Sequence, residues 1–438
     1  MKRGIRSKAI PLTVIMLGLV SLFTDAATEM IYPLIPIFVA TLGSGALILG
    51  IIEGVAETTA SLLKLASGVI SDAIGKRKLL VLIGYGISSI VRPLTAIVTG
   101  AWQIVFVRMA DRVGKGIRTA PRDALIASSV DASIRGKSYG FHRAMDHTGA
   151  VIGPFLAILT LFIVFVIIGV NDVVTGLRIT FAAAIIPGAL AVGVIIFFVK
   201  EAKPAQGTGK IDLSPKGLSP NFFRYLAVAL LFTLGNSSDA FLLFRVEEAM
   251  RESGALISIV QTIPPLAAIV NKFGDAATQA KVVTILFLPI IWAFFHIIKV
   301  IFATPLGALS DRIGRRTVIV AGWAIYAAVY IAFGLLDSFS PTMQLIMTFV
   351  LFAVYALFYS FTEGTEKAFV ADLVPEKRRA SAFGLYHFAV GIGALPASII
   401  FGALYASLGA RFAFSFGALL ALAAMALMLG IVREGKKR

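Results

Sequence analysis

The sequence contains no cysteine and only four histidines in 438 residues, and charged side chains make up just 15% of it. Without cysteine, the chain forms no disulfide and offers no thiol for catalysis or metal binding. Four histidines, among them His142 and His147 in one predicted helix, are too few to indicate a dedicated transition-metal site. The sequence also lacks a P-loop, a nucleophile elbow and a metal-hydrolase motif. We therefore expect no metal, no cofactor, no enzymatic activity and no nucleotide-driven pumping.

The sequence is rich in long runs of apolar residues. Hydrophobic residues make up 58% of the chain, and the mean hydropathy is +0.90, which is far above the range of soluble domains. About twelve apolar runs have the length that a helix needs to cross a bilayer, roughly 20 residues. We therefore predict an all-α membrane protein with twelve transmembrane helices. A cleavable signal peptide is not expected, because the first apolar run is long and leads directly into a second.

The formal net charge of +16 raises the question of a nucleic-acid partner, but its distribution indicates a membrane instead. Basic residues gather in alternate loops, near Lys76, Arg135, Lys203, Arg315 and Arg378, and at both ends of the chain. The other loops carry almost none. This bias places the basic loops and both termini in the cytoplasm. No basic helix lies outside the apolar runs and no nucleic-acid-binding module is present, so we expect no nucleic-acid partner.

One short motif occurs twice, as GVISDAIGKRK at 68–78 and as GALSDRIGRR at 307–316. Two copies at matching places indicate an internal duplication. We expect each copy to form a short cytoplasmic connector, in which the aspartate approaches a helix end and a glycine permits a left-handed turn. The cations hold the connector on the cytoplasmic side. The residues of this gate-loop motif are Gly68, Asp72, Gly75, Lys76, Arg77, Gly307, Asp311, Gly314, Arg315 and Arg316.

The repeated motif resembles the loop between the second and third helices of the major facilitator superfamily, and its weaker counterpart between helices eight and nine. The second copy fits the family pattern fully, whereas the first has Ala73 where the family has a basic residue. A second family pattern, in the fourth helix, matches Arg112, Gly116 and Ala120. In the family that arginine is linked to proton handling. The resemblance implies two pseudo-symmetric six-helix halves that alternate access to a central site.

The domain boundaries follow from composition. Residues 200–221 are rich in proline, glycine and lysine and are predicted to form a flexible cytoplasmic linker. We therefore place the halves at 1–199 and 222–438. One stretch, 251–281, fits the family badly, because a short outer loop is expected there. We predict that it forms an extra outer segment, either an interfacial helix pair or an external lid.

Four acidic residues lie within the first two apolar runs. Asp25 and Glu29 are one turn apart in the first run, and Glu53 and Glu57 are one turn apart in the second. A carboxylate at membrane depth costs about 2.5–3.5 kcal/mol on insertion scales, so it normally faces a cavity or a partner. The functional interpretation is a proton or cation site. The alternatives are a hydrated pair at the outer mouth for the first run and a packing ion pair for the second.

The fourth and fifth apolar runs also carry charge at membrane depth. Arg108, Asp111 and Arg112 lie too deep to reach the interface, so they must be paired or line a wet cavity. Arg143 precedes Asp146 by three residues and can meet it on the same helix. The predicted proton-coupling residues are Asp25, Glu29, Glu53, Glu57, Arg108, Asp111, Arg112, Arg143 and Asp146.

The fifth run contains Gly149, Gly153 and Pro154. Spaced glycines let helices pack closely, and proline bends a helix. This spacing matches the core of the superfamily's antiporter pattern, although the closing glycine pair of that pattern is Ala157-Ile158 here. The resemblance implies export by antiport. The alternative is an ordinary close-packing site.

The second half repeats the first with fewer charges at depth, and Asp239 corresponds roughly to Asp25. We therefore expect the coupling chemistry in the first half and a more apolar, aromatic substrate wall in the second. The alternative for these aromatic residues is packing or contact with lipid. The predicted wall residues are Asp239, Phe241, Phe244, Phe294, Phe295, His296, Tyr355, Tyr359 and His387.

The chain looks like a prokaryotic, drug/proton antiporter-like branch of the superfamily. This implies a proton-coupled exporter of a small organic molecule in a prokaryotic cytoplasmic membrane, functional as a monomer. Asp25, Glu29 or Glu57 would accept the proton, and Asp72 and Asp311 would hold the gate loops. One alternative is an uptake symporter for an anionic nutrient or siderophore. Another is a transporter-like sensor, which long soluble extensions would favour and the sequence does not show.

Overall fold

The computed structural model describes residues 10–74, 77–130, 135–201, 218–250, 254–374 and 379–434. Throughout this part of the chain the regular structure is helical and no strand occurs. Eleven helical stretches of it are long and apolar enough to cross a membrane. A further helix, α5 (Ala101–Ser128), has the length but is less apolar, because charged side chains run along it. With α5 as the fourth span, the prediction of twelve membrane helices is confirmed.

The first half contains six spans, several of them broken into two helices. They are α1 (Leu12–Glu29) with η1 (Tyr32–Leu34) and α2 (Ile35–Thr41), α3 (Ala46–Ile74), α4 (Arg77–Val91) with η2 (Arg92–Ile97), α5, α6 (Arg135–Phe162) with the π-helical η4 (Ile163–Ile168), and α7 (Val173–Ala183) with α8 (Ile185–Phe198). Pro33 and Pro36 mark the break in the first span, since each lacks the amide donor that a continuous helix requires.

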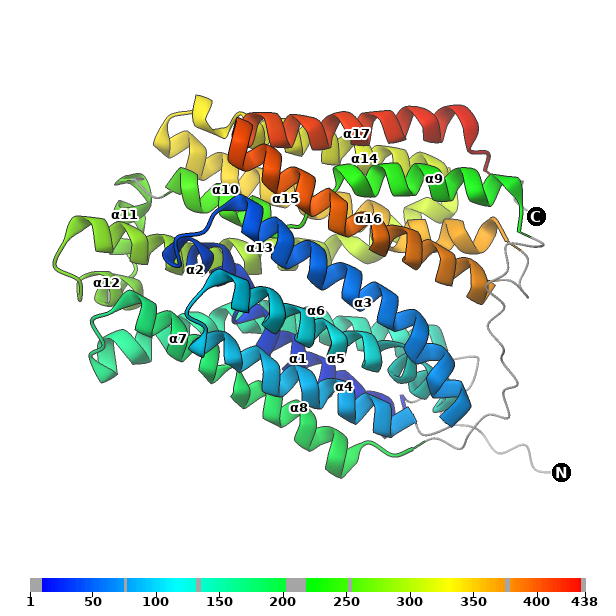
Figure 1. The fold of residues 1–438 in the computed structure, drawn as a ribbon, viewed down its shortest axis with the longest axis horizontal. Helices are drawn as coiled ribbons and strands as arrows, with labels where there is room; N and C mark the ends of the chain where they lie inside the picture. The colour runs from blue at the N-terminus through cyan, green and yellow to red at the C-terminus, as the bar shows by residue number, and fades with distance from the viewer. Residues whose placement is uncertain are drawn as a thin grey trace.

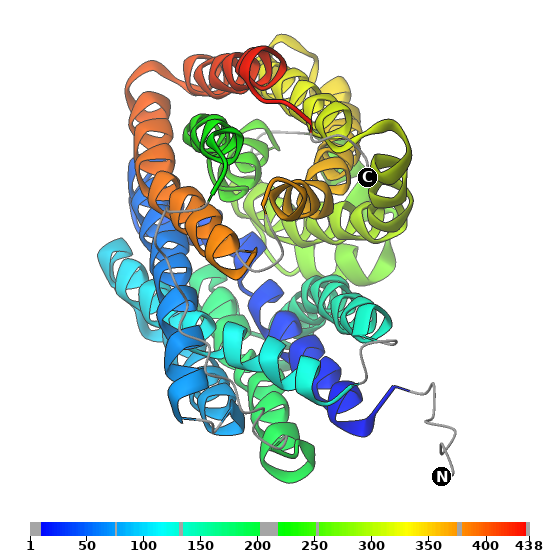
Figure 2. The same cartoon turned by 90° about the vertical axis from the view of Figure 1, so that its right-hand side faces the viewer.

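The second half repeats this order. Its spans are α9 (Pro220–Gly235) with α10 (Ala240–Met250), α13 (Ala276–Ile313), α14 (Arg315–Gly334) with η5 (Leu336–Ser338), α15 (Pro341–Asp372), α16 (Arg379–Leu408) and α17 (Ala410–Ile431). The extra segment forms two short helices, α11 (Gly254–Gln261) and α12 (Pro264–Val270). The helices of the two halves form separate groups in the end-on view of Figure 2.

The molecule has two distinct ends. At the first, which we call the terminal end, α1 begins and α17 ends (right side of Figure 1). At the other, the distal end, lie α11 and α12. Of the two predicted forms of the extra segment, an interfacial helix pair or an external lid, the two short helices resemble the helix pair. Of their apolar side chains, Ile259 is 48% exposed. The division at residues 200–221 stays a prediction, because residues 202–217 lie outside the described part of the chain.

The repeated motif is more helical than predicted. Its Ser-Asp residues belong to the last turns of α3 and α13, not to a loop, because each helix continues for two residues beyond the aspartate. Gly314 then turns the chain with φ at 103°, in the left-handed region that glycine favours, and α14 begins at the next residue. Gly75, Lys76 and the side chains of Asp72 and Asp311 lie outside the described residues.

The end of the chain is attached to this second turn. The carboxylate of Glu434 accepts the amide N–H of Arg315, at 2.6 Å. The amide N–H of Arg433 donates to the Asn221 side chain at 2.9 Å, and the Asn221 side chain donates to the Arg433 carbonyl at 2.6 Å. The residues after α17 therefore join the beginning of α9 to the corner between α13 and α14.

The halves pack closely where α3 crosses α16. A Cβ atom added to Gly50 would lie 2.3 Å from the carbonyl oxygen of Ser398, and one added to Gly391 would lie 2.2 Å from Cβ of Ser61. Thr58 donates across the same crossing to the Gly391 carbonyl, at 2.7 Å. Glycine at these positions is therefore required for the close approach.

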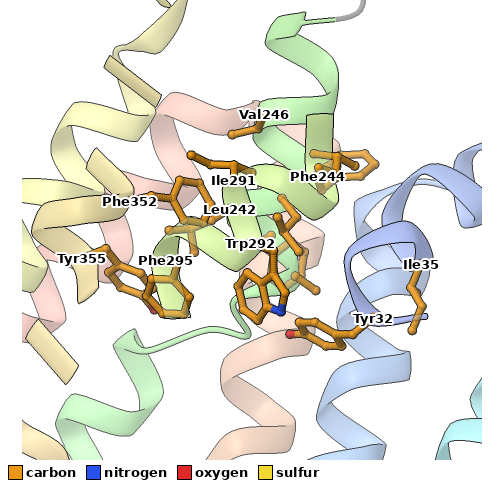
Figure 3. Close-up of a cluster of buried hydrophobic side chains, with 14 of the residues drawn as sticks. Tyr32, Ile35, Leu242, Phe244, Val246, Ile291, Trp292, Phe295, Phe352 and Tyr355 are labelled. Carbon is orange, nitrogen blue, oxygen red and sulfur yellow. The ribbon is translucent and has the colours of Figure 1, made fainter. Parts of the chain in front are cut away.

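Toward the distal end the two halves meet in a cluster of buried apolar side chains. Figure 3 shows side chains of the first span, such as Tyr32 and Ile35, beside side chains of α10 and α13. The ring centroids of Tyr32 and Trp292 are 5.2 Å apart. Phe38, Leu242 and Phe295 are fully buried. The two halves also line a further cavity, of about 590 Å³, with side chains that include Ile37 of the first half and Lys281 of the second.

Candidate functional site

A cavity of about 530 Å³ lies between the two halves. Its wall is formed by the first span, α3, α5 and α6 of the first half and by the helices around α10, α13, α15 and α16 of the second. The wall is polar and contains charged groups of both signs, which are Asp25, Glu29, Glu53, Glu57, Arg92, Arg112, Lys115, Arg118, Arg143, Asp146, Asp239, Lys299 and Glu363. Such a concave site with converging polar groups is typical of a substrate-binding site.

Three arginine–carboxylate pairs form a layer in the first half. Nη2 of Arg108 lies 2.7 Å from Oε1 of Glu53, and both side chains are more than nine-tenths buried. Nε of Arg92 lies 2.9 Å from Oδ1 of Asp111, also in a buried pair. Each pair therefore places a guanidinium, which stays charged, against a buried carboxylate. The expectation that charges on the fourth span would be paired at depth fits this geometry.

The third pair differs from the other two. Nη2 of Arg112 lies 3.5 Å from Oε1 of Glu57, and the Glu57 side chain is 42% exposed. The Glu57 carboxylate therefore faces the water of the cavity and is not locked to its arginine. Of the three pairs, this one is the most easily exchanged for a proton or a substrate group.

Glu53 and Glu29 connect the first half to the second. The Ser238 hydroxyl donates to Oε2 of Glu53 at 3.1 Å. The Trp292 indole N–H donates to Oε2 of Glu29 at 2.7 Å. Because these contacts cross between the halves, they stabilise the present arrangement of the two halves.

Asp25 lies on the cavity wall without a partner. Within the described residues its carboxylate forms no hydrogen bond and no ion pair. Its electrostatic neighbours are Glu29, Lys115, Arg118 and Asp146. A carboxylate in this position can take up or release a proton without breaking a bonded pair.

The predicted antiporter-like motif packs directly against the helix that carries Asp25 and Glu29. A Cβ atom at Gly149 would lie 2.3 Å from the Leu22 carbonyl oxygen, and one at Gly153 would lie 2.6 Å from the Ala26 carbonyl oxygen. Pro154 lies inside α6 immediately after this contact. The motif therefore determines how closely α6 approaches the turn of α1 between the two acids.

Asp146 forms a second small network nearer the terminal end. Nδ1 of His142 and Nη1 of Arg143 each lie 3.6 Å from Oδ2 of Asp146. The other ring nitrogen of His142 lies 2.9 Å from the Ser21 hydroxyl of α1. The predicted contact between Arg143 and Asp146 is present, and the network ties α6 to α1.

Asp239 is held by hydroxyl groups and not by a cation. Oδ1 of Asp239 accepts from Tyr355 at 2.6 Å and from Tyr359 at 2.9 Å. Nζ of Lys299 lies 4.2 Å from the ring centroid of Tyr359. Asp239 is the last residue of the break between α9 and α10, whereas Asp25 lies within α1, about one turn before the break in its own span. Asp25 and Asp239 therefore lie in equivalent spans but at different positions along them.

The predicted substrate wall is only partly at the cavity. Tyr359 and His296 line it, whereas Tyr355 is buried behind Tyr359. Phe241 instead packs against Phe401, with ring centroids 4.6 Å apart. Like Phe241, the predicted wall residues Phe244, Phe294 and Phe295 belong to the apolar packing and do not line the cavity.

His387 lies in a side pocket that adjoins the cavity. Several residues at the site were missed by sequence reasoning. Arg92 was not among the predicted residues, although a charged residue at this depth and the buried Asp111 opposite it were signals. Trp292 and Ser238 carry no charge, and only the fold brings them to Glu29 and Glu53. For these two the sequence offered no signal.

Comparisons with known proteins agree with this architecture. The family model of the Major Facilitator Superfamily matches residues 17–297 and 253–438. The chain belongs to the major facilitator superfamily. It is therefore a multi-pass membrane protein and a secondary transporter, as the repeated gate-loop motif led us to expect.

Among its relatives is an uncharacterised MFS-type transporter of Methanocaldococcus jannaschii, 32% identical over 95% of this chain and 94% of the relative. An uncharacterised protein of Mycobacterium tuberculosis is 27% identical over 87% of this chain and 83% of that protein. Solved structures with the same fold include the D-xylose-proton symporter, with a TM-score of 0.70 and 16% identity over 97% of this chain and 98% of that one. A bacterial homologue of the human lysosomal transporter Spinster, solved in an inward-facing and occupied conformation, has a TM-score of 0.68 and 15% identity over 96% of each chain.

Proposed function

We propose that this superfamily member is a proton-coupled antiporter that exports a small organic molecule by alternating access. It works in a prokaryotic cytoplasmic membrane with both termini in the cytoplasm, and it functions as a monomer. The terminal end is then the cytoplasmic side, and the cavity faces the cytoplasm in this structure. The observation that carries the proposal is the unpartnered carboxylate of Asp25 on the cavity wall.

Asp25 is the group suited to bind the proton. Each of the other acids of the first half that line the cavity has a partner: Glu53 and Glu57 lie beside arginines, Asp146 lies beside His142 and Arg143, and Glu29 accepts the Trp292 N–H. Lys115 and Arg118 lie near Asp25. A cationic substrate entering from the cytoplasm competes electrostatically with a proton on Asp25, which is the requirement for exchange.

Glu57 and Arg112 supply a second, weaker switch. Because their contact is 3.5 Å and Glu57 is 42% exposed, the pair is open to water. Movement of α5 against α3 changes this distance directly. Tightening of the pair keeps Glu57 ionised and favours proton release, whereas loosening allows Glu57 to take up a proton.

The direction of transport is inferred from α6. The glycine positions of the antiporter-like motif bring α6 against α1 at the turn between Asp25 and Glu29. Coupling between helix rocking and the proton site is therefore direct. Asp72 and Asp311, by the resemblance, hold the gate loops while the cavity faces outward.

The second candidate is uptake by symport of an anionic nutrient or siderophore. It is favoured by Lys115 and Lys299, which line the cavity and have no carboxylate within ion-pair distance among the described residues. A free cation on each half is suited to bind an anion between them. A transporter-like sensor would bind a ligand in the same cavity without moving protons.

The test uses purified protein in liposomes that contain a pH dye. Candidate organic cations, drugs and anions are added singly, and substrate-dependent proton movement is recorded. Protons moving opposite to the substrate would support antiport, and protons moving with it would establish symport instead. Binding with no flux of either would leave the sensor.

The same liposome assay is applied to the variant Asp25→Asn, which removes the ionisable group and keeps the size of the side chain. We expect it to abolish substrate-driven proton flux while substrate exchange continues. The control is Asp275→Asn, the same change at the exposed first turn of α13, where asparagine still caps the helix. Full proton flux in Asp25→Asn would contradict the assignment of Asp25.

A further inference from the structure

A side pocket of about 230 Å³ opens from the central cavity into the second half. The two spaces share Thr233, Asn236, Tyr359 and Glu363. Behind them the pocket extends between α9, α14, α15 and α16. Its volume is below the range of a whole drug-sized site, so it accommodates one functional group of a substrate and the atoms next to it.

At the side of this pocket lies Glu366, whose carboxylate has only neutral partners. Oε1 accepts the Trp323 indole N–H at 3.0 Å, and Oε2 accepts the Tyr386 hydroxyl at 2.6 Å. Among the described residues, no cation lies within ion-pair distance of it. A carboxylate offers about four acceptor positions, so two remain for a ligand.

Several aromatic side chains also line the pocket. The rings of Phe232 and Trp323 are stacked, with centroids 4.5 Å apart and an angle of 7° between their planes. Phe358 packs against the same Phe232 ring at 5.9 Å, and Tyr359 adjoins Phe358 at 4.9 Å. Aromatic faces attract cations because of their quadrupole, and they repel anions.

A second acceptor without a donor lies at the mouth of the pocket. Oδ1 of Asn236 is fully buried and has no hydrogen-bond partner in the described part of the chain. Buried polar groups are nearly always satisfied, so an orphaned acceptor at a cavity indicates a missing donor. Asn236 thus lacks a donor among the described residues, and Glu366 has acceptor positions left beyond its two bonds, so both can accept N–H bonds from a ligand.

The charges of the pocket wall favour a cation. Lys367 also lines the pocket and interacts electrostatically with both Glu363 and Glu366 on α15. Lys299, which lines the central cavity, interacts with Glu363 as well. The wall of the side pocket itself therefore holds two carboxylates and one ammonium group. His387, also in the wall, adds no fixed charge.

We propose that the side pocket binds a protonated amine of the transported molecule, with Glu366 and Asn236 accepting its N–H bonds and the aromatic side chains surrounding it. This inference rests on the proposed transport function and gives the substrate class, which is an organic ammonium ion. It also assigns recognition to the second half, whereas Asp25 of the first half handles the proton.

The experiment measures binding to the purified full-length protein in detergent at pH 7 by calorimetry. Three probes of similar size are compared, which are phenethylamine, its trimethylammonium analogue and 3-phenylpropionate. We expect phenethylamine to bind most tightly, the analogue without N–H donors to bind at least about fivefold more weakly, and the anion not to bind. Equal binding of the anion and the amine would overturn the proposal.

The diagnostic variant is Glu366→Gln, which we expect to weaken phenethylamine binding at least about tenfold. Its matched control is Glu248→Gln, the same change at another tyrosine-held carboxylate, bonded to Tyr405 outside both cavities. The control should bind like the wild type. Unchanged binding by Glu366→Gln would reject the site.

If Glu366→Gln does not fold, Val390→Phe supplies the test, because it fills the pocket and leaves its polar groups unchanged. Loss of amine binding would support the site, and wild-type binding would overturn it. Because this binding requires no proton movement, the two proposals fail separately. If the probes and variants bind as expected but no proton flux occurs, only the proposal of a proton-coupled exporter is rejected. Amine-driven proton flux with unaltered binding by the variants would reject the side pocket alone.

Discussion

The two halves of this transporter hold their membrane-depth carboxylates in different ways. In the first half, Glu53 and Asp111 are bonded to arginines in buried pairs. In the second half, Asp239 and Glu366 accept bonds from tyrosine and tryptophan, which are neutral. An arginine keeps its carboxylate ionised, whereas a neutral donor allows it to gain a proton or to bind a cation. Glu53 and Asp111 of the first half are thus held in fixed ion pairs, whereas Asp239 and Glu366 of the second half can still bind a proton or a cationic ligand.

The largest effect that this comparison predicts is on stability in the first half. Arg108→Gln leaves the Glu53 carboxylate buried without its cation, and we expect a loss of about 3–5 kcal/mol in the free energy of unfolding. Unfolding in detergent, followed by calorimetry or circular dichroism, measures this loss. The double variant Arg108→Met with Glu53→Leu should recover much of it. A double variant as unstable as the single one would show that the pair is not the cause.

A smaller effect is expected for the equivalent change in the second half. Tyr355→Phe removes one neutral donor from Asp239 and should cost about 1–3 kcal/mol, since Tyr359 still donates to the same carboxylate. The same unfolding measurement applies. The matched control is Tyr405→Phe, which removes a hydroxyl donor from Glu248 at the distal side. A loss as large as that of Arg108→Gln would remove the distinction between the halves.

A still smaller effect is expected for the contact that joins the halves. Trp292→Phe keeps an aromatic ring but removes the N–H bond to Glu29, whose net contribution is about 0.5–1.5 kcal/mol. We expect the population open at the terminal end to fall. Because the chain has no cysteine, a single Ala394→Cys substitution on the cavity wall reports this as a slower reaction with a thiol reagent added from that side. An unchanged rate would show that the bond does not bias the equilibrium.

The smallest effect concerns two exposed helix caps, at which the halves should behave alike. Asp172 accepts the Thr175 hydroxyl and amide bonds at the start of α7, and these bonds lower the pKa of Asp172. Asp275 caps α13 with its bond from Thr278, which lowers the pKa of Asp275 in the same way. Since both pKa values are lowered on folding, the stabilisation is present above the unfolded value of about 3.9 and is lost as the pH falls through the folded value.

Alanine at either cap should lower the unfolding midpoint at neutral pH by at most about 2 °C, and by less below pH 4. A thermal scan at pH 7 and at pH 3.5 measures both. A marked difference between the two caps would show that the halves differ in more than their buried acids.

Much of the fold could be predicted because it depends on local properties. The lengths of the apolar runs predicted the membrane spans, and the repeated GxxSDxIG pattern predicted the internal duplication. The helix break at Pro33 and the left-handed turn at Gly314 follow from the backbone chemistry of those residues. The extent of the helices into the gate-loop motif was missed, because an aspartate near a helix end looks the same whether it lies inside the last turn or beyond it.

The candidate site was predicted only where charge gave a signal. Asp25, Glu53 and Arg108 were conspicuous because charges at membrane depth are costly. Which acid pairs with which base depends on helix rotation, which the sequence does not specify. Trp323 and Tyr386 are ordinary residues in an apolar helix, and only the packing of α14 and α16 brings them to Glu366. Among the aromatic candidates, Tyr359 lines the cavity, whereas Phe241 packs against Phe401, a difference that also depends on helix rotation.

The attachment of the residues after α17 has a mechanical consequence. Glu434 holds the corner between α13 and α14, and Arg433 holds the start of α9. Helices that are distant in the sequence are thereby tied together at the terminal end. During rocking, this end of the second half should act as one rigid lever, so a force or a fusion partner acting on the tail is transmitted to the corner that carries the second copy of the gate-loop motif.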